Sequence, residues 1–443
     1  MTPLELGARE RIRRAARTGS AIAQIYLGYK GLHLLDRGPL RGVVGAARRR
    51  WDRVSAATLG GAARDLGGVL LKAGQFLSTR ADVLPPAYVE RLARLQDRAR
   101  PQPYALVHQV LEEDLGAAPE ELFARIWRRP MAAASLAQVH RATLHDGREV
   151  AVKVQRADVR AALSADLATL RVAARAIEGL EGSLGFSLLL DQLEDSLGRE
   201  LDFALEATSA GRLARCFAGS PEVRIPAVIG EFTRPRVLVT EYLPGIRVTD
   251  RARLQRAGVD PAAVVEALLR AYAAQVFEHG LFHADPHPGN LLVLPGEAGA
   301  FALGFVDFGI VQEVPAGFRA AALELARAVL ARDAAGAAAA LRALGLTTRD
   351  PQARTIERFA EKLMSHLDAR AAGGALAGER IARLGEELQA LLRADPLATL
   401  PPHLFLLGRV LGLLAGVSAQ LGVRANLARA LLPSLFEARS GPR

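Results

Sequence analysis

The sequence predicts an α+β protein with a small lobe rich in strands, a larger helical lobe and a helical extension ahead of both. The stretch 135–155 alternates apolar and polar residues on both sides of an Asp146-Gly147 turn, which is typical of a β-hairpin. Residues 159–217 and 315–432 instead carry apolar residues at helical spacing. The Leu-Pro-Gly sequence at 243–245 breaks the chain between the strand-rich part and the second helical part.

The composition is that of a large folded protein. Of the 443 residues, 50% are apolar and 23% are charged, which excludes a disordered or fibrous chain, and the length indicates two or three domains or lobes. We expect a basic helical segment at 1–50, a helical extension at 51–103, the small lobe at 104–243 and the large lobe at 244–443. Within the extension, helices are expected at 56–76 and 86–97.

The charged residues are unusual in kind. Lys and Arg total 57 against 47 Asp and Glu, a formal net charge of +10, which suits nucleic acid, nucleotide phosphates or anionic lipid. Only Lys30, Lys72, Lys153 and Lys362 are lysines. Because Arg is used everywhere else, each lysine is a candidate for a specific role. The single cysteine, Cys216, excludes an intramolecular disulfide and favours a reducing compartment.

Two segments bear on membrane contact. The run 404–423 is strongly apolar but contains Arg409, which costs about 2.5–3.5 kcal/mol at the centre of a membrane helix, so we expect a buried helix. Residues 1–50 combine scattered arginines with an apolar run at 21–29, which fits either a solvated capping helix or an interfacial helix at an anionic membrane. The arginines also interrupt any signal-peptide core. We expect a cytoplasmic protein, peripheral at the inner face of the cell membrane if the N-terminal helix is interfacial.

Lys153 is the first candidate for chemistry. It ends the sequence VAVK at 150–153, in the second strand of the predicted hairpin. A lone lysine on a strand is usually a solvated residue, but the scarcity of lysine favours contact with the phosphates of a nucleotide. Two further strands are expected at 227–231 and 236–242.

Two polar segments further along the chain combine carboxylates with an amide. The segment 281–290, LFHADPHPGN, places Asp285 five residues before Asn290, and the segment 305–309, FVDFG, places Asp307 at the end of an apolar strand. Carboxylate and amide oxygens, together with phosphate oxygens, are ligands that Mg²⁺ prefers. If one Asp and the Asn bind the ion, the other Asp can orient or deprotonate an attacking hydroxyl. Each residue alone fits a turn or cap. Together they indicate a nucleotide and Mg²⁺ site.

The order VAVK, HADPHPGN and VDFG resembles a protein-kinase-like fold, specifically the UbiB/AarF family of atypical kinases. Three more segments are similar to motifs of that family: LKAGQ at 71–75 resembles its KxGQ motif, AAAS at 132–135 its alanine-rich loop, and ELD at 200–202 its ExD motif. The resemblance covers roughly residues 55–420 and implies a two-lobed kinase-like fold.

The resemblance also implies a role for each residue of the nucleotide site. Lys153 would hold the α and β phosphates of ATP or ADP and pair with Glu206. Asp285 would occupy the catalytic-base position, and Asn290 and Asp307 would bind Mg²⁺. The other nucleotide-binding positions implied are Ala132, Ala133, Ala134, Ser135, Glu241 and Leu243.

The KxGQ and ExD motifs imply a regulatory contact. Lys72 and Gln75 would reach into the cleft, where Lys72 would pair with Glu200 or Asp202. Since Asp202 and Glu206 are four residues apart and would share a helix face, neighbouring carboxylates could serve two lysines. A mere packing ion pair between Lys72 and Glu200 is the alternative.

Departures from ordinary kinases bear on the substrate. Alanines at 132–134 would restrict a phosphate-covering loop that glycines leave open, which should change nucleotide preference and slow transfer. Ala284 stands where ordinary kinases have Arg, and the chain runs from Gly309 to Pro315 without a long activation segment. Phosphorylation of other proteins is therefore not expected.

The family resemblance implies an atypical kinase or ATPase that supports isoprenoid quinone biosynthesis of the ubiquinone type, at or near the membrane. Its expected partners are a nucleotide, a lipid or quinone-precursor ligand and quinone-biosynthesis proteins. A small-molecule kinase of the aminoglycoside or choline kinase type is an alternative, although it leaves the KAGQ, AAAS and ELD segments unexplained. A nucleotide-binding scaffold without catalysis is another. Nucleic-acid binding is not expected, because no aromatic platform or known module supports it.

Overall fold

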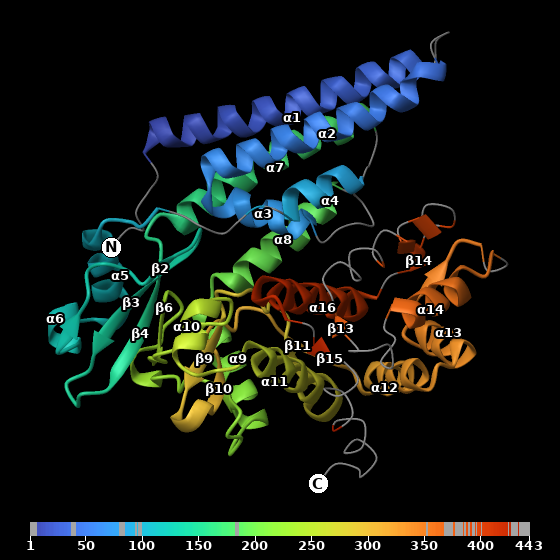
Figure 1. The fold of residues 1–443 in the computed structure, drawn as a ribbon. Helices are drawn as coiled ribbons and strands as arrows, with labels where there is room; N and C mark the ends of the chain where they lie inside the picture. Colours follow the sequence, from blue (N-terminus) through green and yellow to red (C-terminus); the bar gives the residue numbers. More distant parts are fainter. Residues whose placement is uncertain are drawn as a thin grey trace. The chain divides into compact units, whose positions relative to one another are not determined.

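The computed structural model describes residues 7–36, 41–78, 85–93, 95, 100–181, 186–350, 353–366 and 401–423, with short pieces between 375 and 399 and at 425, 426 and 433. Figure 1 shows the elements in chain order. The chain forms two compact units, the first made of Met1–Leu205 and Val228–Tyr242 and the second of Glu206–Ala227 and Leu243–Arg443.

The second unit takes in a segment that we expected in the small lobe. Within Glu206–Ala227, strand β5 (Val223–Arg224) pairs in parallel with β10 (Phe301–Phe305). The backbone N–H of Leu303 donates to the carbonyl of Glu222 at 2.8 Å, and Arg270 binds the Glu222 carboxylate at 3.1 Å. These contacts explain why the segment belongs to the second unit.

Helices form the N-terminal part of the first unit (Figure 1): α1 (Ala8–Asp36), α2 (Arg41–Leu66), α3 (Gly68–Ser78) and α4 (Pro86–Ala93). The single helix expected at 56–76 is wrong, because Gly67 and Gly68 have φ values of +59° and +52° and separate α2 from α3. Glycine adopts such angles without steric cost. The apolar faces of α2, α3 and α4 share a core that includes Leu71 and Leu92.

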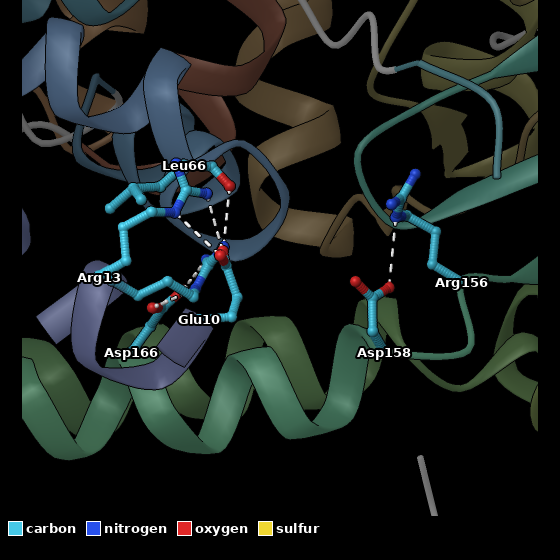
Figure 2. Close-up of polar contacts among 7 residues, drawn as sticks. Glu10, Arg13, Leu66, Arg156, Asp158 and Asp166 are labelled. Carbon is cyan, nitrogen blue, oxygen red and sulfur yellow. Dashed lines mark hydrogen bonds and ion pairs between the residues drawn. The ribbon is translucent and has the colours of Figure 1, made fainter. Parts of the chain in front are cut away.

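A buried ion pair attaches α1 to the rest of the first unit. The Arg14 guanidinium binds the carboxylate of Asp166 on α7 (Val159–Glu181), with Nε 3.0 Å from Oδ1, and donates to the carbonyl of Leu66 at 2.9 Å. Figure 2 shows Asp166 and Leu66 in this cluster beside Glu10 and Arg13 of α1. The N-terminal helix is therefore not simply a solvated element.

The sheet of the first unit contains the predicted hairpin. Its strands are β1 (Arg125–Ile126), β2 (Ala132–Ala133), β3 (Ala137–Thr143), β4 (Glu149–Gln155) and β6 (Val237–Glu241), in the order β1-β3-β4-β6 with β2 also paired to β3. The turn between β3 and β4 has Gly147 at φ +87°, so the hairpin is confirmed. Val150, Val152 and Val154 alternate into a core shared with α5 (Tyr104–Leu115).

The strand expected at 227–231 is wrong. That stretch contains one isolated bridge between Val228 and Thr240, followed by a short 3-10 helix at Gly230–Phe232. Pro226 precedes it, and proline cannot donate to a ladder. The strand expected at 236–242 is confirmed as β6.

Helices complete the first unit: α6 (Pro119–Leu122), α7, α8 (Phe186–Glu200) and the start of α9 (Phe203–Cys216). Ala73 of α3 is buried with Leu136, Leu197 and Leu201. The helix with the KxGQ-like sequence therefore packs against α7, α8 and the residue that follows the alanine-rich segment.

The second unit has a small sheet beside its helices. Strands β5, β10, β9 (Leu291–Pro295) and β7 (Ile246–Arg247) are neighbours in that order, and β8 (Leu281–His283) pairs with β11 (Val311–Glu313). The helical elements before and between these strands are α10 (Arg251–Arg256), α11 (Pro261–Ala273), the π-helical turn Ala274–His279 and the 3-10 helix Glu297–Gly299.

The C-terminal half of the second unit is helical, as expected, with α12 (Ala316–Ala331), α13 (Ala334–Ala343), α14 (Thr355–His366) and α16 (Pro402–Leu421). Two short strand pairs accompany them, β12 (Thr347–Thr348) with β14 (Leu397–Thr399) and β13 (Ala375–Leu376) with β15 (Ala425–Asn426). Residues Val410, Leu414 and Val417 of α16 are buried. No helix in the described part of the chain has the length and apolar character needed to span a membrane.

Candidate active site

The loop that carries Asp285 is fixed by its own backbone. It follows β8, whose three residues are buried, and precedes β9. The N–H of Ala284 donates to the carbonyl of Ile310 at 2.9 Å, that of His287 to Asp285 at 2.7 Å, and that of Asn290 to His287 at 2.8 Å. Ala284 is fully buried, so a larger side chain such as Arg would not fit there without rearrangement.

Asp285 and Asn290 are in direct contact. The Nδ2 of Asn290 lies 3.2 Å from both the Oδ2 and the backbone carbonyl of Asp285. This contact fixes the amide so that its nitrogen faces Asp285, and the oxygen is the atom of Asn290 available as a cation ligand. Both side chains are half-buried. The structure therefore brings together the two residues that the D-x4-N spacing suggested.

Asp307 lies at the same end of the small sheet as Asn290. Strands β9 and β10 pair antiparallel up to Phe305 and Leu291, and the N–H of Val306 donates to the carbonyl of Asn290 at 3.1 Å. The Oδ1 of Asp307 accepts from the N–H of Gly309 at 3.1 Å, which turns the chain sharply after the carboxylate.

These donors fit Mg²⁺ held jointly with a nucleotide. Among the residues that the structure describes, no group of three or more His, Cys, Asp or Glu side chains is arranged to hold a metal. One carboxylate, from Asp307, and one amide oxygen, from Asn290, make an incomplete set by themselves. Mg²⁺ commonly takes one or two protein oxygens and completes its octahedron with phosphate oxygens and water.

A buried histidine that the sequence reasoning missed supports Asp307. His283 is 1% exposed, its Nε2 donates to the backbone carbonyl of Asp307, and its Nδ1 accepts from the hydroxyl of Tyr272 at 3.2 Å. The backbone N–H of His283 donates to Gln275 at 2.8 Å. Burial lowers the pKa of His283, which favours the neutral imidazole that this hydrogen-bond pattern requires. Its only sequence signal is its place two residues before Asp285.

A second missed residue reaches Asp285 from a distant part of the chain. The Nη2 of Arg409, on α16, donates to the Oδ1 of Asp285 at 2.7 Å. From the sequence alone, Arg409 is only a charge that disfavours a membrane span. The signal that could have found it is its position as the one Lys, Arg, Asp or Glu in Pro402–Leu421.

Glu206 contacts the backbone beside Asp307. Its Oε1 accepts from the N–H of Phe308 at 3.3 Å, and the side chain is buried. Arg212, further along α9, forms an ion pair with Glu313 of β11, and the ring of Phe217 meets that of His279. The part of α9 in the second unit is thus attached to the strands that flank the Asp307 loop. Leu243 is buried in the same unit and lies close to Gly304.

Lys153 lies in the centre of the sheet of the first unit. It is opposite Val139 on β3 and Leu238 on β6, and its ammonium is 5.1 Å from the centre of the Phe203 ring. Glu241, opposite Val150, is at the end of β6. The pairing of Lys153 with Glu206 and its contact with phosphates stay predictions.

The alanine-rich segment is only partly a loop. Ala132 and Ala133 form strand β2, paired with Val139 and Gln138, and the N–H of Ala134 donates to the carbonyl of Ala137 at 2.8 Å. Ser135 is buried. The segment therefore makes a tight turn back into β3, and half of it is a strand where we expected a restricted loop.

The KxGQ-like and ExD-like segments meet in the first unit. Lys72 forms an ion pair with Glu200, at the end of α8, whereas Asp202 accepts from the N–H of Ala204 at 3.0 Å and caps α9. Of the two carboxylates we considered for Lys72, Glu200 is the partner that the structure gives. The side chain of Gln75 falls outside the described part of the chain.

Comparisons with known proteins identify the family. Residues 94–341, more than half of the chain, match the ABC1 atypical kinase-like domain. The chain belongs to the ABC1 atypical kinase-like family. The family resemblance and the kinase-like α+β fold expected from the sequence are thereby confirmed.

Individual ABC1 relatives match over part of their length. A probable protein kinase UbiB of Pseudomonas aeruginosa is 40% identical over 267 residues, which cover 60% of this chain and 50% of that protein. The chloroplastic protein ACTIVITY OF BC1 COMPLEX KINASE 8 of Arabidopsis thaliana is 34% identical over 326 residues, 72% of this chain and 42% of that protein. The chain thus spans about half, or less, of these curated relatives.

One solved structure agrees with most of the chain. The Mycobacterium tuberculosis protein Rv3197, solved as a complex with erythromycin, superposes with a TM-score of 0.61 at 27% identity, covering 88% of this chain and all of that one.

Proposed function

We propose that this ABC1 protein binds Mg²⁺ with ATP or ADP and hydrolyses or transfers the terminal phosphate, in support of isoprenoid quinone biosynthesis. The observation that carries the proposal is the arrangement of Asp285, Asn290 and Asp307. A carboxylate in hydrogen-bond contact with an amide, beside a second carboxylate at a sharp turn, matches the requirements of a metal-assisted phosphoryl transfer.

Each residue then has a separate task. Asn290 and Asp307 would hold Mg²⁺, whose charge offsets that of the nucleotide phosphates. Asp285 would orient the attacking oxygen and accept its proton. His283 and Glu206, through their contacts with the backbone at 307–308, would keep the Asp307 turn in place. Lys153 would bind the α and β phosphates.

The absence of a peptide-docking segment favours a small or lipid acceptor over a protein. After Gly309 the chain forms β11 and then α12, which begins at Ala316, so a long activation segment is missing from this fully described stretch. The link to quinones rests on analogy with the relatives named UbiB.

Contact with an anionic membrane is part of the proposal, because quinone precursors are lipid-soluble. Helix α1 leaves Ile12, Leu27 and Leu34 at least 59% exposed, and Arg9, Arg11 and Arg13 near its start are exposed as well. Exposed apolar side chains with neighbouring arginines are typical of helices that lie at an anionic lipid surface.

Complementation tests the pathway and the metal site together. A quinone-deficient bacterial strain that lacks its UbiB-type protein would receive the wild type, Asp307→Asn, or the control Glu297→Gln, an exposed carboxylate outside the site. We expect quinone to be restored by the wild type and the control and not by Asp307→Asn. Restoration by Asp307→Asn at equal protein abundance would contradict the proposed role of the site.

A soluble acceptor is the second candidate. The related Rv3197 structure contains erythromycin, a hydroxylated macrolide, which gives a specific reason to test hydroxylated small molecules. If this candidate is correct, a screen of soluble alcohols and macrolides will yield a phosphorylated product, detected by mass spectrometry, that Asp307→Asn does not form. Mg-ATP turnover without any such product would favour the first candidate.

A further inference from the structure

Helix α16 contributes one charged side chain to the Asp285 loop. Its sequence, Pro402–Leu421, contains no Lys, Asp or Glu and a single Arg. The buried residues Val410, Leu414 and Val417 fix the helix through apolar packing. Arg409 lies at the edge of that buried face, with its side chain 34% exposed. The helix therefore does not depend on Arg409 for its own position.

The contact between Arg409 and Asp285 acts on the carboxylate and not on the loop. The loop backbone is already held by three hydrogen bonds and by the contact of Asn290 with the Asp285 carbonyl. Arg409 binds Oδ1 at 2.7 Å, and Asn290 lies 3.2 Å from Oδ2. Because each carboxylate oxygen of Asp285 is contacted by a different donor, the rotation of the carboxylate about χ2 is fixed. Each oxygen still has a lone pair for another proton.

The loop itself offers no permanent positive charge. The segment 281–290 contains neither Lys nor Arg, although Asp285 would work next to the negative phosphates of a nucleotide. An unbalanced carboxylate would be repelled by those phosphates. A guanidinium, which stays protonated under all ordinary conditions, can balance the charge of Asp285 while leaving the carboxylate ionised.

We propose that Arg409 is a positioning residue for phosphoryl transfer, supplied to the catalytic loop by a helix that lies 124 residues further along the chain. It holds the Asp285 carboxylate in the rotamer that faces the attacking oxygen. In the step, that oxygen forms a bond to the γ-phosphorus, the bond to the β–γ bridging oxygen breaks with its electron pair leaving on ADP, and the proton passes to Asp285. Arg409 remains protonated throughout. The inference rests on the proposed function.

Steady-state kinetics test this role. The wild type, Arg409→Lys, Arg409→Gln and Arg409→Ala are compared for Mg-ATP turnover and, separately, for nucleotide Kd. We expect Arg409→Gln to lower kcat about 10- to 100-fold while Kd stays within about twofold, since Arg409 acts on Asp285 and not on the nucleotide. Arg409→Lys should keep part of the activity. Added guanidinium at millimolar concentration should restore part of the kcat of Arg409→Ala.

A matched control separates this effect from general loss of an ion pair. Arg342→Gln breaks the contact between α13 and α14, in which Arg342 lies 2.5 Å from Glu357 in the same unit, and it should leave kcat unchanged.

Wild-type kcat in Arg409→Gln, with Asp307→Asn inactive, overturns the inference and leaves the proposed function standing. Loss of kcat in Arg409→Ala without guanidinium rescue, accompanied by lower thermal stability, assigns Arg409 a structural role and also overturns it. Failure of the wild type to bind Mg-ATP contradicts the proposed function itself.

A second readout needs no nucleotide. Thermal unfolding of Arg409→Gln, Asp285→Asn and the double variant, measured on the free protein, should be non-additive, because the two side chains share one contact. Additive shifts in Tm would show that the side chains are not paired in solution and would overturn the inference.

Discussion

At the scale of single residues, Arg14 and Asp166 show how much one buried ion pair can matter for the stability of the fold. Their side chains are 8% and 1% exposed, so both charges have lost most of their hydration. Burial raises the pKa of Asp166 above its ordinary value of 3.8, although the Arg14 guanidinium opposes the shift. Removal of one partner of such a pair leaves the other as an uncompensated buried charge.

Arg14→Met should lower the free energy of unfolding by about 3–5 kcal/mol near neutral pH, as measured by chemical denaturation. Because the pKa of Asp166 is raised in the folded protein and rises further without Arg14, the variant holds a proton that the unfolded chain releases. Its stability deficit should therefore be smallest near about pH 4 and grow as the pH rises to about 7.

Arg13→Met is the matched control, since Arg13 is an exposed neighbour paired only with Glu10 in the contacts described, and we expect it to have little effect. Arg14→Met combined with Asp166→Leu should recover most of the loss. A pH-independent deficit, or equal effects at positions 13 and 14, would contradict this explanation.

The residues of the candidate site differ in whether a short sequence motif is enough to find them. The contact between Asp285 and Asn290 could be predicted, because it depends on spacing within a short motif, while the chemical roles of Asp285, Asn290 and Asp307 stay predictions. Arg409 could not be predicted, since its contact with Asp285 depends on the packing of α16, more than a hundred residues away. His283 was missed for a different reason. A histidine in an apolar strand is usually a core residue, and only its contacts with Tyr272 and Asp307 distinguish it.

At the scale of elements, α1 combines attachment to the protein with an exposed apolar face. Leu27 and Leu34 are seven residues, about two helical turns, apart, and Ile12 precedes Leu27 by about four turns, so the three share one side of the helix. Arg14 is on the buried side. This division predicts that the outer face can meet a lipid surface while the helix stays folded on the protein.

Cosedimentation with vesicles of phosphatidylcholine and phosphatidylglycerol tests that face. The triple variant Ile12→Ser, Leu27→Ser, Leu34→Ser should lose at least about tenfold in partitioning, given the area of apolar surface involved. The control Val172→Ser, Leu180→Ser, at exposed positions of α7, should not. Added salt should weaken binding of the wild type, because the arginines contribute about 1 kcal/mol each near an anionic surface. Equal sedimentation of both variants would exclude α1 as the contact.

Element boundaries were the part of the fold that the sequence predicted least well. The hairpin at 137–155 was predictable because alternation and the Asp-Gly turn agree. The break between α2 and α3 depends on positive φ angles at Gly67 and Gly68, which helical periodicity does not reveal. The failed strand at 227–231 has the right residue types, but only Val228 finds a partner.

At the scale of the whole molecule, the limits of the two compact units could not be predicted from the motifs. We expected Glu206–Ala227 within the small lobe, yet β5 pairs with β10 and Glu206 contacts Phe308 in the second unit. Such pairing depends on tertiary contacts that no local pattern encodes. Consequently Glu206 is structurally tied to the Asp307 turn, although sequence reasoning considered it mainly as a partner for Lys153.

The central claim is that Asp307 and Asn290 bind Mg²⁺ together with a nucleotide. Isothermal titration of ATP into the wild type, Asp307→Asn and the control Glu297→Gln, each with and without Mg²⁺, tests it most directly. We predict that the wild type and the control bind ATP more tightly with Mg²⁺, and that Asp307→Asn loses at least about tenfold in affinity, or about 1.4 kcal/mol, only when Mg²⁺ is present. Absence of ATP binding by the wild type, or equal Mg²⁺-dependent affinity in Asp307→Asn, would contradict the claim.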